Sequence, residues 1–274
     1  MKVSIVIPAR NEPYLQKTIL DLLKKASGDI EIIAVLDGYW PPSEKIVDDK
    51  RVKYIHYAPA RGMRNAINAG VAIANGEFIL KCDAHVMFGE GFDEILQKDC
   101  NVDYVVVPRR YALLPETWEI EKNPKYPIDY MYLDKELHGQ NWPEKNKNPE
   151  FEKVLIDDLM SSQGSCWFMK KSYFEKLELM DEENYGMFSS EFQEIGLKCW
   201  LSGGRVVVNK KTWYAHWHKT EGRGYSLDKE EFEKGNKFTE NWRTFNKAWD
   251  KQTLPLGWLY KKFGREEDYW GSRI

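Results

Sequence analysis

Residues 77–88, EFILKCDAHVMF, indicate both the fold and the site. The largely apolar residues 77–82 predict a buried strand, which runs directly into Asp83-Ala84-His85. An Asp and a His two residues apart at the end of a strand project toward the same side. A carboxylate and an imidazole suit Mn²⁺, whereas a site for Mg²⁺ alone would favour oxygen ligands. The pattern therefore predicts a metal site at a strand end, although an exposed turn with two polar residues would look the same.

The strand at 77–82 is one of several that alternate with helices. Short apolar runs predict further strands at 3–8, 31–36, 52–56, 104–108, 165–169 and 205–208. Helical periodicity predicts helices at 14–25, 61–75, 171–178 and 190–202. This alternation predicts an α/β fold with a mostly parallel, doubly wound central sheet flanked by helices. Ligands of such sheets bind beyond the carboxyl ends of the strands, where the sequence places Arg10, Asn11, Glu12, Asp37, Asp83 and His85.

Length and charge limit the class of protein. A chain of 274 residues suits one large domain with at most a short appendage. The 40 Lys and Arg residues nearly balance the 43 Asp and Glu residues, so the composition shows no basic excess typical of nucleic-acid binders. The four cysteines lack CxxC spacing and are interpreted as buried free thiols. Because we see no signal pattern and no long apolar run, we expect a cytoplasmic protein, in a host cytoplasm if phage-encoded, with no membrane partner.

Five segments, in order along residues 3–219, resemble GT-A fold, family 2-like glycosyltransferases. The resemblance is closest to the catalytic domain of the polypeptide N-acetylgalactosaminyltransferases, whose metal motif is D-x-H, as in residues 83–85. VSIVIPARNE (3–12), EIIAVLDG (31–38) and the segment 61–85 resemble that family's first strands and Arg-bearing helix. FSSEFQEIGLKCWLSGG (188–204) resembles its W-G-G-E-N-x-E segment, and YAHWHK (214–219) resembles its G-H-x-F-R segment.

The resemblance implies a UDP-sugar donor and a metal, Mn²⁺ or alternatively Mg²⁺, held by Asp83, His85 and His216. A metal there would bridge the donor phosphates and stabilise the leaving nucleoside diphosphate. Asp37 would contact the nucleobase or ribose, although Leu36 replaces a second acidic residue of the family. The remaining residues expected to contact the donor are Pro8, Arg10, Glu12, Arg61, Arg64 and His218.

The acidic residues Glu191 and Glu194 are spaced so that both can share one face of a helix. Inverting family 2 enzymes have an Asp base after the first of these positions, whereas this chain has Phe192. In the N-acetylgalactosaminyltransferase pattern, Glu191 matches a Glu at the sugar or acceptor. The resemblance therefore implies catalytic roles for Glu191 and Asp83 and a reaction with retention, in which the leaving phosphate takes the acceptor proton. Glu194 is interpreted as a helix-surface residue.

The acceptor has two interpretations of about equal weight. The chain resembles compact phage and viral transferases that modify 5-hydroxymethylpyrimidines in DNA, and a protein Ser/Thr or glycan hydroxyl is the alternative. A DNA acceptor could use the basic and aromatic side chains of Arg109, Arg110, Tyr111, Trp118, Lys122, Lys125, Tyr126, Trp142, Lys145, Lys147 and Lys153. Two other classes also remain, a nucleotidyltransferase and an inactive nucleotide-sugar-binding module, but the chain lacks the Gly-rich phosphate loop of the former.

The predicted domains are a catalytic domain, 1–218, and a C-terminal extension, 219–274. Within the former, residues 1–110 would bind the nucleotide-sugar and 111–218 would face the acceptor. Residues 219–236, with Gly222 and Gly224, are predicted as a mobile loop that closes over the donor as a lid, followed by helical segments interrupted by Pro255.

Several aromatic residues lie close to His216 in the sequence. One or more of Trp213, Tyr214 and Trp217 could stack on a sugar or an acceptor, whereas Trp167 and Phe168 are expected in the core.

Overall fold

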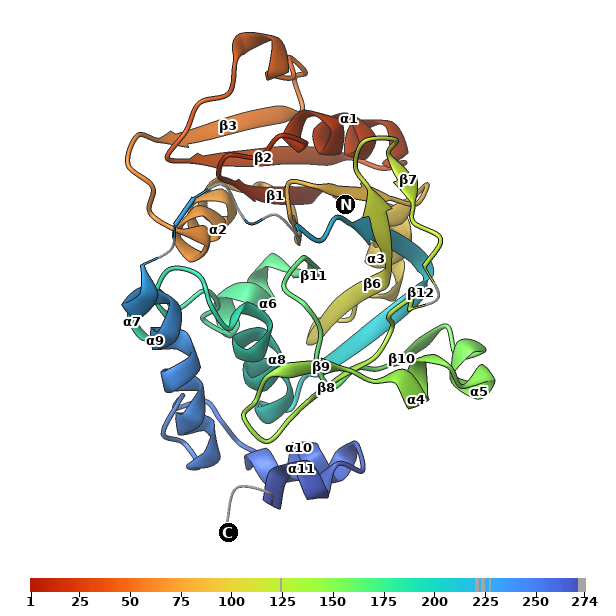
Figure 1. The fold of residues 1–274 in the computed structure, drawn as a ribbon, viewed down its shortest axis with the longest axis vertical. Coiled ribbons are helices and arrows are strands. Elements are labelled where there is room, and N and C mark those ends of the chain that lie inside the picture. Colours follow the sequence, from red (N-terminus) through yellow and green to blue (C-terminus); the bar gives the residue numbers. More distant parts are fainter. Residues whose placement is uncertain (124, 220–221, 223–224, 227, 271–274) are drawn as a thin grey trace.

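A mixed sheet lies at the centre of the structure, a computed structural model that describes residues 1–123, 125–219, 222, 225–226 and 228–270 (Figure 1). Eight strands of the described chain lie in the order β10 (Ile156–Asp158), β12 (Arg205–His216), β6 (Tyr104–Leu114), β11 (Cys166–Lys170), β4 (Phe78–Cys82), β1 (Val3–Ala9), β2 (Ile30–Asp37) and β3 (Val52–Tyr57). Two short strands pair outside this order, β5 (Val86–Phe88) with β12 and β7 (Glu119–Ile120) with β6.

Most of the central pairings are parallel. β4, β1, β2 and β3 pair in parallel, and so do β6 and β12. β11 runs antiparallel between β4 and β6, and β10 runs antiparallel beside β12. The prediction of an α/β fold with a mostly parallel sheet is confirmed.

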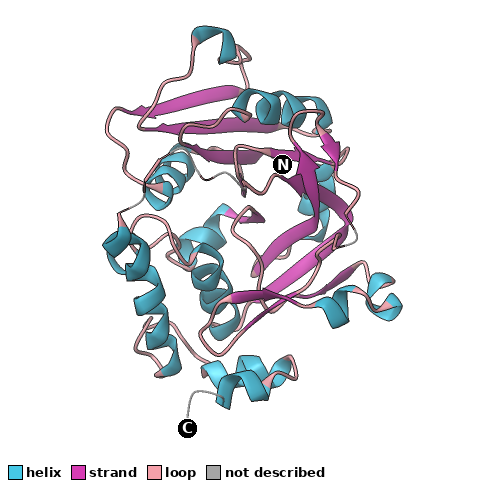
Figure 2. Cartoon of the chain, in the orientation of Figure 1, coloured by secondary structure: helices cyan, strands magenta, loops and turns pink. Residues whose placement is uncertain are grey.

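Helices cover both faces of the sheet (Figure 2). Alternate residues of a strand point to opposite faces, so that Ile5 and Ile7 of β1 join one apolar cluster and Val6 joins the other. The first cluster packs against α1 (Leu15–Lys25) and α3 (Phe92–Asp99). The second packs against α2 (Met63–Ile73), α6 (Lys171–Lys176) and α8 (Glu191–Leu201). The strands therefore need apolar residues on both faces, which explains their nearly continuous apolar runs.

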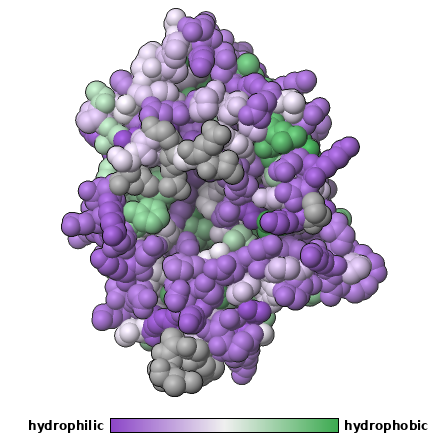
Figure 3. Space-filling model, in the orientation of Figure 1, coloured by the Kyte–Doolittle hydropathy of each residue, from purple (hydrophilic) through white to green (hydrophobic). Residues whose placement is uncertain are grey.

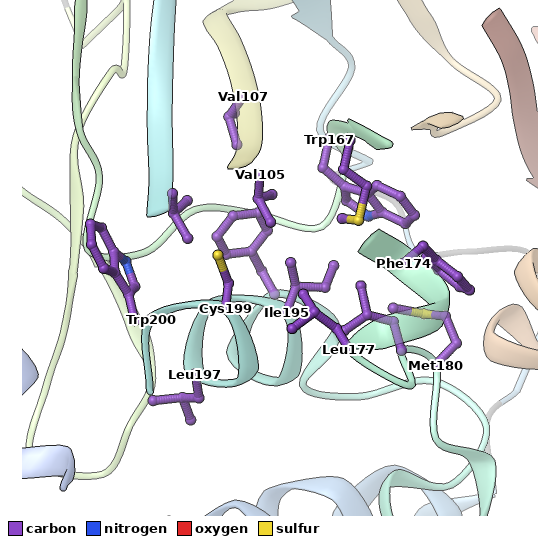
Figure 4. Packing of buried hydrophobic residues seen from close by; sticks show 14 of the residues in the cluster. Val105, Val107, Trp167, Phe174, Leu177, Met180, Ile195, Leu197, Cys199 and Trp200 are labelled. Atoms are coloured by element: carbon purple, nitrogen blue, oxygen red, sulfur yellow. The ribbon is translucent and has the colours of Figure 1, made fainter. Parts of the chain in front are cut away.

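The larger core cluster centres on α8. Figure 4 shows Ile195 and Cys199 of this helix pointing toward Val105 and Trp167 of the sheet. Trp167 is fully buried, as the sequence predicted, and truncating such a side chain to Ala costs about 3–5 kcal/mol. The interpretation of all four cysteines as buried free thiols is also confirmed.

Strand β12 is longer than predicted because it contains a bulge. Asn209 pairs with Pro108 of β6, and Trp213 pairs with the next residue, Arg109, so residues 210–212 have no partner on β6. The side chain of Asn209 accepts a hydrogen bond from the Lys211 amide at 3.0 Å and stabilises this irregular turn. After the bulge the strand continues to His216, which pairs with Val86 of β5. The polar residues of the bulge hid this continuation from sequence analysis.

The segment between β6 and β11 is less regular. It contains the hairpin β8 (Met131–Leu133) and β9 (Gly139–Asn141) and two short helices, α4 (Pro143–Asn146) and α5 (Pro149–Glu152). Two further short helices are η1 (Ser43–Lys45) and α7 (Glu182–Tyr185).

The C-terminal segment forms α9 (Lys229–Thr239), η2 (Glu240–Arg243), α10 (Leu256–Lys262) and α11 (Glu266–Trp270). The predicted loop over 219–236 is therefore wrong from residue 229 onward, because Asp228 caps α9 by accepting a hydrogen bond from the Glu231 amide. Gly224 lies outside the described residues. Pro255 precedes α10 and does not interrupt a helix. Trp242 and Tyr260 are buried in the larger core cluster, so this segment packs against the helices and strands of that cluster.

The surface drawn in Figure 3 is largely hydrophilic, and its apolar areas are separate from one another. Within the described part of the chain, no helix combines the length and apolar character that crossing a bilayer requires.

Candidate functional site

A cavity of about 1080 Å³ lies at the carboxyl ends of β1, β2 and β4. The ends of these strands contribute Pro8, Asp37 and the segment Asp83-Ala84-His85 to its lining. The end of β12 and the residues that follow it contribute 216–219, and the loops 162–165 and 187–190 also line the cavity. This is the place where parallel sheets hold ligands, as the sequence predicted.

Asp83, His85 and His216 come together in this cavity although 133 positions separate the first from the last. His216 Nε2 lies 3.1 Å from Asp83 Oδ2 and 3.2 Å from His85 Nε2. One ligand atom of each residue lies within 4.8 Å of the others. Burial lowers the pKa of His216 to about 3, although Asp83 opposes that effect, so its imidazole is neutral near pH 7. Two imidazoles and a carboxylate that converge in this way are suitable ligands for a divalent metal ion.

Glu12 orients His85 from behind. Its Oε2 lies 2.9 Å from His85 Nδ1, and its Oε1 accepts a hydrogen bond from Lys219 Nζ at 2.6 Å. An imidazole that donates Nδ1–H to a carboxylate presents the lone pair of Nε2, as metal-ligating histidines commonly do. The structure thus places Glu12 next to His85, whereas the sequence led us to expect it beside the donor.

Lys81 is a buried cation that sequence analysis missed. Its Nζ donates to Asp83 Oδ1 at 2.8 Å, to the Gly164 carbonyl at 2.6 Å and to Glu191 at 3.1 Å. Burial alone would lower the pKa of Lys81, but Asp83 and Glu191 raise it above its usual value, so the ammonium is charged. Because Lys81 occupies Oδ1 of Asp83, Oδ2 is the oxygen that faces the two imidazoles. The sequence does contain a signal for this residue, because Lys81 is a single charged residue in an otherwise apolar strand. It lies two residues before Asp83, so both side chains point to the same face of the sheet.

Glu191 is anchored on the cavity wall by two donors. Trp167 Nε1 donates to Oε1 at 2.8 Å, and Lys81 donates to Oε2 at 3.1 Å. Burial raises the pKa of Glu191, while Lys81 opposes that effect. Gly164 leaves room for this carboxylate, since a Cβ at position 164 would overlap it. Both oxygens of Glu191 are therefore engaged by the protein.

Glu194, one turn further along α8, occupies a different environment. The prediction that it lies on the helix surface is wrong, because its side chain is 0% exposed. It forms an ion pair with Arg64 and accepts a hydrogen bond from Lys198 Nζ at 2.8 Å. Arg64 also donates to the Ser189 carbonyl at 2.7 Å and does not line the cavity. This burial does not fit the phosphate contact expected of Arg64.

Two other residues that were expected to contact the UDP-sugar are in contact with other parts of the chain. Asp37 accepts hydrogen bonds from the Arg61 and Gly62 amides at 2.6 and 3.0 Å, and so fixes the turn before α2. The exposed guanidinium of Arg61 lies 4.4 Å from the centroid of the Tyr57 ring and is absent from the cavity lining. Asp37 itself does line the cavity.

Arg10 and His218 also line the cavity. The Arg10 guanidinium lies 4.2 Å from the centroid of the Tyr225 ring. The imidazole of His218 lies edge-on to His216 at a centroid distance of 4.7 Å, and burial lowers the pKa of His218 to about 4.

Of the aromatic residues near His216, Trp217 lines the cavity and lies edge-on to His85. Tyr214 is buried and hydrogen-bonded to Ser165 at 2.8 Å, so it is not available to stack on a ligand.

The basic surface expected for a DNA acceptor is partly engaged within the chain. Arg109 donates to Asp129 and to Glu152, each at 2.7 Å. Arg110 is only 3% exposed. The ammonium of Lys145 lies over an aromatic ring at 4.1 Å from its centroid. These cations are therefore poorly placed to meet phosphates.

Comparison with known proteins shows a family and a fold. The family described as "Glycosyl transferase family 2" matches residues 4–178. Among curated proteins, the glycosyltransferase GlyG of Streptococcus pneumoniae serotype 4 is 32% identical over 111 residues, which are 36% of this chain and 37% of GlyG. Human polypeptide N-acetylgalactosaminyltransferase 18 is 24% identical over 211 residues, which are 76% of this chain and 33% of the relative. The chain thus spans about a third of the length of these relatives.

Among solved structures, GalNAc-T7 with UDP, GalNAc and Mn²⁺ superimposes with a TM-score of 0.71 at 17% identity. The match covers 100% of this chain and 56% of that chain. At this identity the likeness shows the fold alone, which is the GT-A arrangement predicted from the sequence.

Proposed function

The chain belongs to glycosyltransferase family 2, and on that premise we propose that it moves a sugar from a UDP-sugar to a hydroxyl acceptor with the help of a divalent metal ion. The observation that carries this proposal is the convergence of Asp83 Oδ2, His85 Nε2 and His216 Nε2 in the cavity at the strand ends. GalNAc-T7, which shares the fold, has been solved with UDP and Mn²⁺, and this supports the choice of donor and metal.

The side chains present fit Mn²⁺, with Mg²⁺ as the alternative. Two imidazoles in a set of three favour Mn²⁺, because Mg²⁺ prefers oxygen ligands. Glu12 would hold His85 in the ligating tautomer, and Lys81 would hold Asp83 with Oδ2 forward. A bound metal would supply Lewis-acid stabilisation of the leaving diphosphate. On this proposal Pro8, Arg10, Glu12, Asp37 and His218 lie on the donor side, and Arg61 and Arg64 are left out.

The surroundings of Glu191 support transfer with retention. An inverting reaction needs a base that reaches the acceptor hydroxyl, but the Lys81 ammonium and the Trp167 indole hold the Glu191 carboxylate against the cavity wall. The next residue, Phe192, is 2% exposed in the core and offers no base. On this proposal the acceptor attacks from the face that UDP leaves, and the hydroxyl proton goes to the departing diphosphate. Proton NMR of the product would show the anomeric coupling of the donor sugar, and the inverted coupling would contradict retention.

We also propose that the catalytic domain ends near residue 218 and that the extension, 219–274, adds a wall to its cavity. Asp228, which caps α9, and the α9 residues Glu231, Phe232 and Asn236 line the cavity and support this division of roles.

Purified protein with Mn²⁺ and UDP-glucose, UDP-galactose, UDP-GlcNAc or UDP-GalNAc would test the function by release of UDP. We expect metal-dependent release with one of these donors and its loss in Asp83→Ala. Asp48→Ala, at an exposed carboxylate outside the cavity, is the matched control. Tight UDP binding without release from any donor would contradict the proposal and favour a nucleotide-sugar-binding module.

A further inference from the structure

Two phenylalanines form an aromatic surface on the cavity wall to which α9 contributes. The rings of Phe188 and Phe232 stack with centroids 6.3 Å apart and planes inclined by 24°. Both side chains line the cavity, and Phe232 remains 37% exposed. This Phe188–Phe232 surface therefore presents apolar faces to the same space that contains Asp83 and Glu191. Aromatic faces in a cavity with a few polar groups are typical of a binding site for an organic ligand.

The Phe188–Phe232 surface is held by contacts between its two carriers, the segment 185–190 and α9. Ser190 Oγ donates to Asn236 Oδ1 at 2.8 Å. Gly235 allows α9 to lie against this segment, because a Cβ there would come within 2.8 Å of the Tyr185 carbonyl. Tyr185 packs edge-on against Phe238 at a centroid distance of 5.0 Å. A surface fixed in this way loses little entropy when a ligand binds.

Two of the polar side chains beside the Phe188–Phe232 surface are carboxylates. The carboxylates of Asp228 and Glu231 line the cavity next to it. Ionised carboxylates accept hydrogen bonds only, so they suit a ligand that donates through hydroxyl groups. A pyranose ring offers an apolar face for stacking and hydroxyl donors at its edge. The combination of stacked rings and carboxylates fits this chemistry.

The charge of the cavity opposes a polyanionic acceptor. The described lining residues include the carboxylates of Glu12, Asp37, Asp83, Glu191, Asp228 and Glu231. Among the same residues, the permanent cations are Arg10 and Lys219, and Lys219 is paired with Glu12. DNA binding depends on several Lys or Arg contacts to phosphates. A DNA strand that approached the Phe188–Phe232 surface would instead place its phosphates near two carboxylates.

We propose that the Phe188–Phe232 surface is the acceptor subsite and that the acceptor is an uncharged saccharide. This inference rests on the transferase function proposed above and names its substrate class. In the transfer, an acceptor hydroxyl oxygen forms the new bond to the anomeric carbon, while the bond from that carbon to the diphosphate breaks. The hydroxyl proton leaves with UDP, so the step balances without a further reactant.

The test compares acceptors and variants in one assay. Cellotetraose, maltotetraose and chitotetraose are offered as saccharides, beside an uncharged Ser/Thr peptide and hydroxymethylcytosine DNA, with the donor that gives UDP release. We expect transfer to a saccharide, with little dependence on salt. Phe232→Ala should raise the acceptor KM about tenfold, as expected for the loss of one aromatic contact. Phe232→Tyr should restore most of the affinity, and the Kd of UDP measured by calorimetry should change less than twofold in both variants.

Phe245→Ala is the matched control, because Phe245 is 52% exposed and lies outside the cavity lining. An acceptor KM that is unchanged in Phe232→Ala would overturn the subsite. Transfer to DNA that falls steeply with salt, or transfer to the peptide alone, would overturn the saccharide class. No metal-dependent UDP release with any donor would overturn the transferase proposal itself, and this inference with it.

Discussion

Two buried clusters of charge lie one turn apart on α8. Lys81, Asp83 and Glu191 form the first, and Arg64, Glu194 and Lys198 form the second. The side chain of Asp83 is 29% exposed and opens to the cavity, whereas the pair of Arg64 and Glu194 is 0% exposed. The two clusters thus contain the same types of residue, but only the first one is accessible from the cavity. A carboxylate with an oxygen facing open space can bind a ligand, and one enclosed by its partners can only hold the fold.

The energetics of the two clusters should differ accordingly. Removing one partner of an enclosed ion pair leaves an uncompensated charge, which costs about 3–5 kcal/mol of stability. Neutralising Asp83 at the cavity still leaves Lys81 paired with Glu191, so stability should change less and ligand binding more. The following substitutions test this distinction.

The largest effect is expected for Asp83→Asn. The amide would keep the shape but remove the charge that a metal ion needs, so we expect the rate of UDP release to fall about 1000-fold or more. Urea denaturation should show a stability within about 1 kcal/mol of the unchanged protein. A variant that keeps its rate would show that Asp83 is structural, as Glu194 is.

In the enclosed cluster, Glu194→Gln should destabilise the protein by about 3 kcal/mol, because the Arg64 guanidinium would lose its counter-charge. The denaturation midpoint in urea measures this loss. The triple variant Arg64→Met, Glu194→Leu and Lys198→Met should recover part of it, since it removes every charge of this cluster. If Glu194→Gln instead left stability intact and abolished UDP release, the proposed division between the clusters would be wrong.

Lys81→Met tests whether the open cluster is positioned by its lysine. Without the ammonium, Asp83 Oδ1 and Glu191 lose a shared donor, and we expect UDP release to fall about 10–100-fold, the usual cost of losing a group that orients a metal ligand. Titration of Mn²⁺ followed by electron paramagnetic resonance, without donor present, gives a second readout, and weaker binding is expected. Tighter Mn²⁺ binding with an unchanged rate would mean that Lys81 is only a counter-charge.

The smallest effect is expected for Glu12→Gln, at the outer edge of the open cluster. The amide can still accept a hydrogen bond from His85, but its neutral oxygen orients the imidazole less strongly. Mn²⁺ affinity should fall about tenfold. Glu116→Gln, at a carboxylate outside the cavity lining, is the control, and an equal loss in both variants would contradict a specific role for Glu12.

The sequence was most informative where local pattern and burial agree. The apolar runs of β1, β2 and β4 predicted their strands, and the family resemblance predicted the approach of His216 to Asp83. Spacing alone could not separate Glu191 from Glu194, because their difference depends on Lys81 and Arg64, which come from distant strands and helices. The start of α9 was missed although Asp228 is a common capping residue, since the segment around it is polar and rich in glycine. Residues 210–212 hid the second half of β12 for a similar reason.

The bulge in β12 has a consequence for changes in chain length. Residues 205–209 pair with the first half of β6, and residues 213–216 pair with its second half and end at the site. Residues 210–212, which have no partner on β6, determine which face of the sheet the side chains after them point to. Because side chains alternate along a strand, the loss of one residue there would leave the core half in place and turn His216 to the opposite face. Trp217 would then occupy its position in the sheet. Lys211, which is exposed, should tolerate substitution. A single-residue deletion beside it should instead shift the register of every residue from 213 to 216.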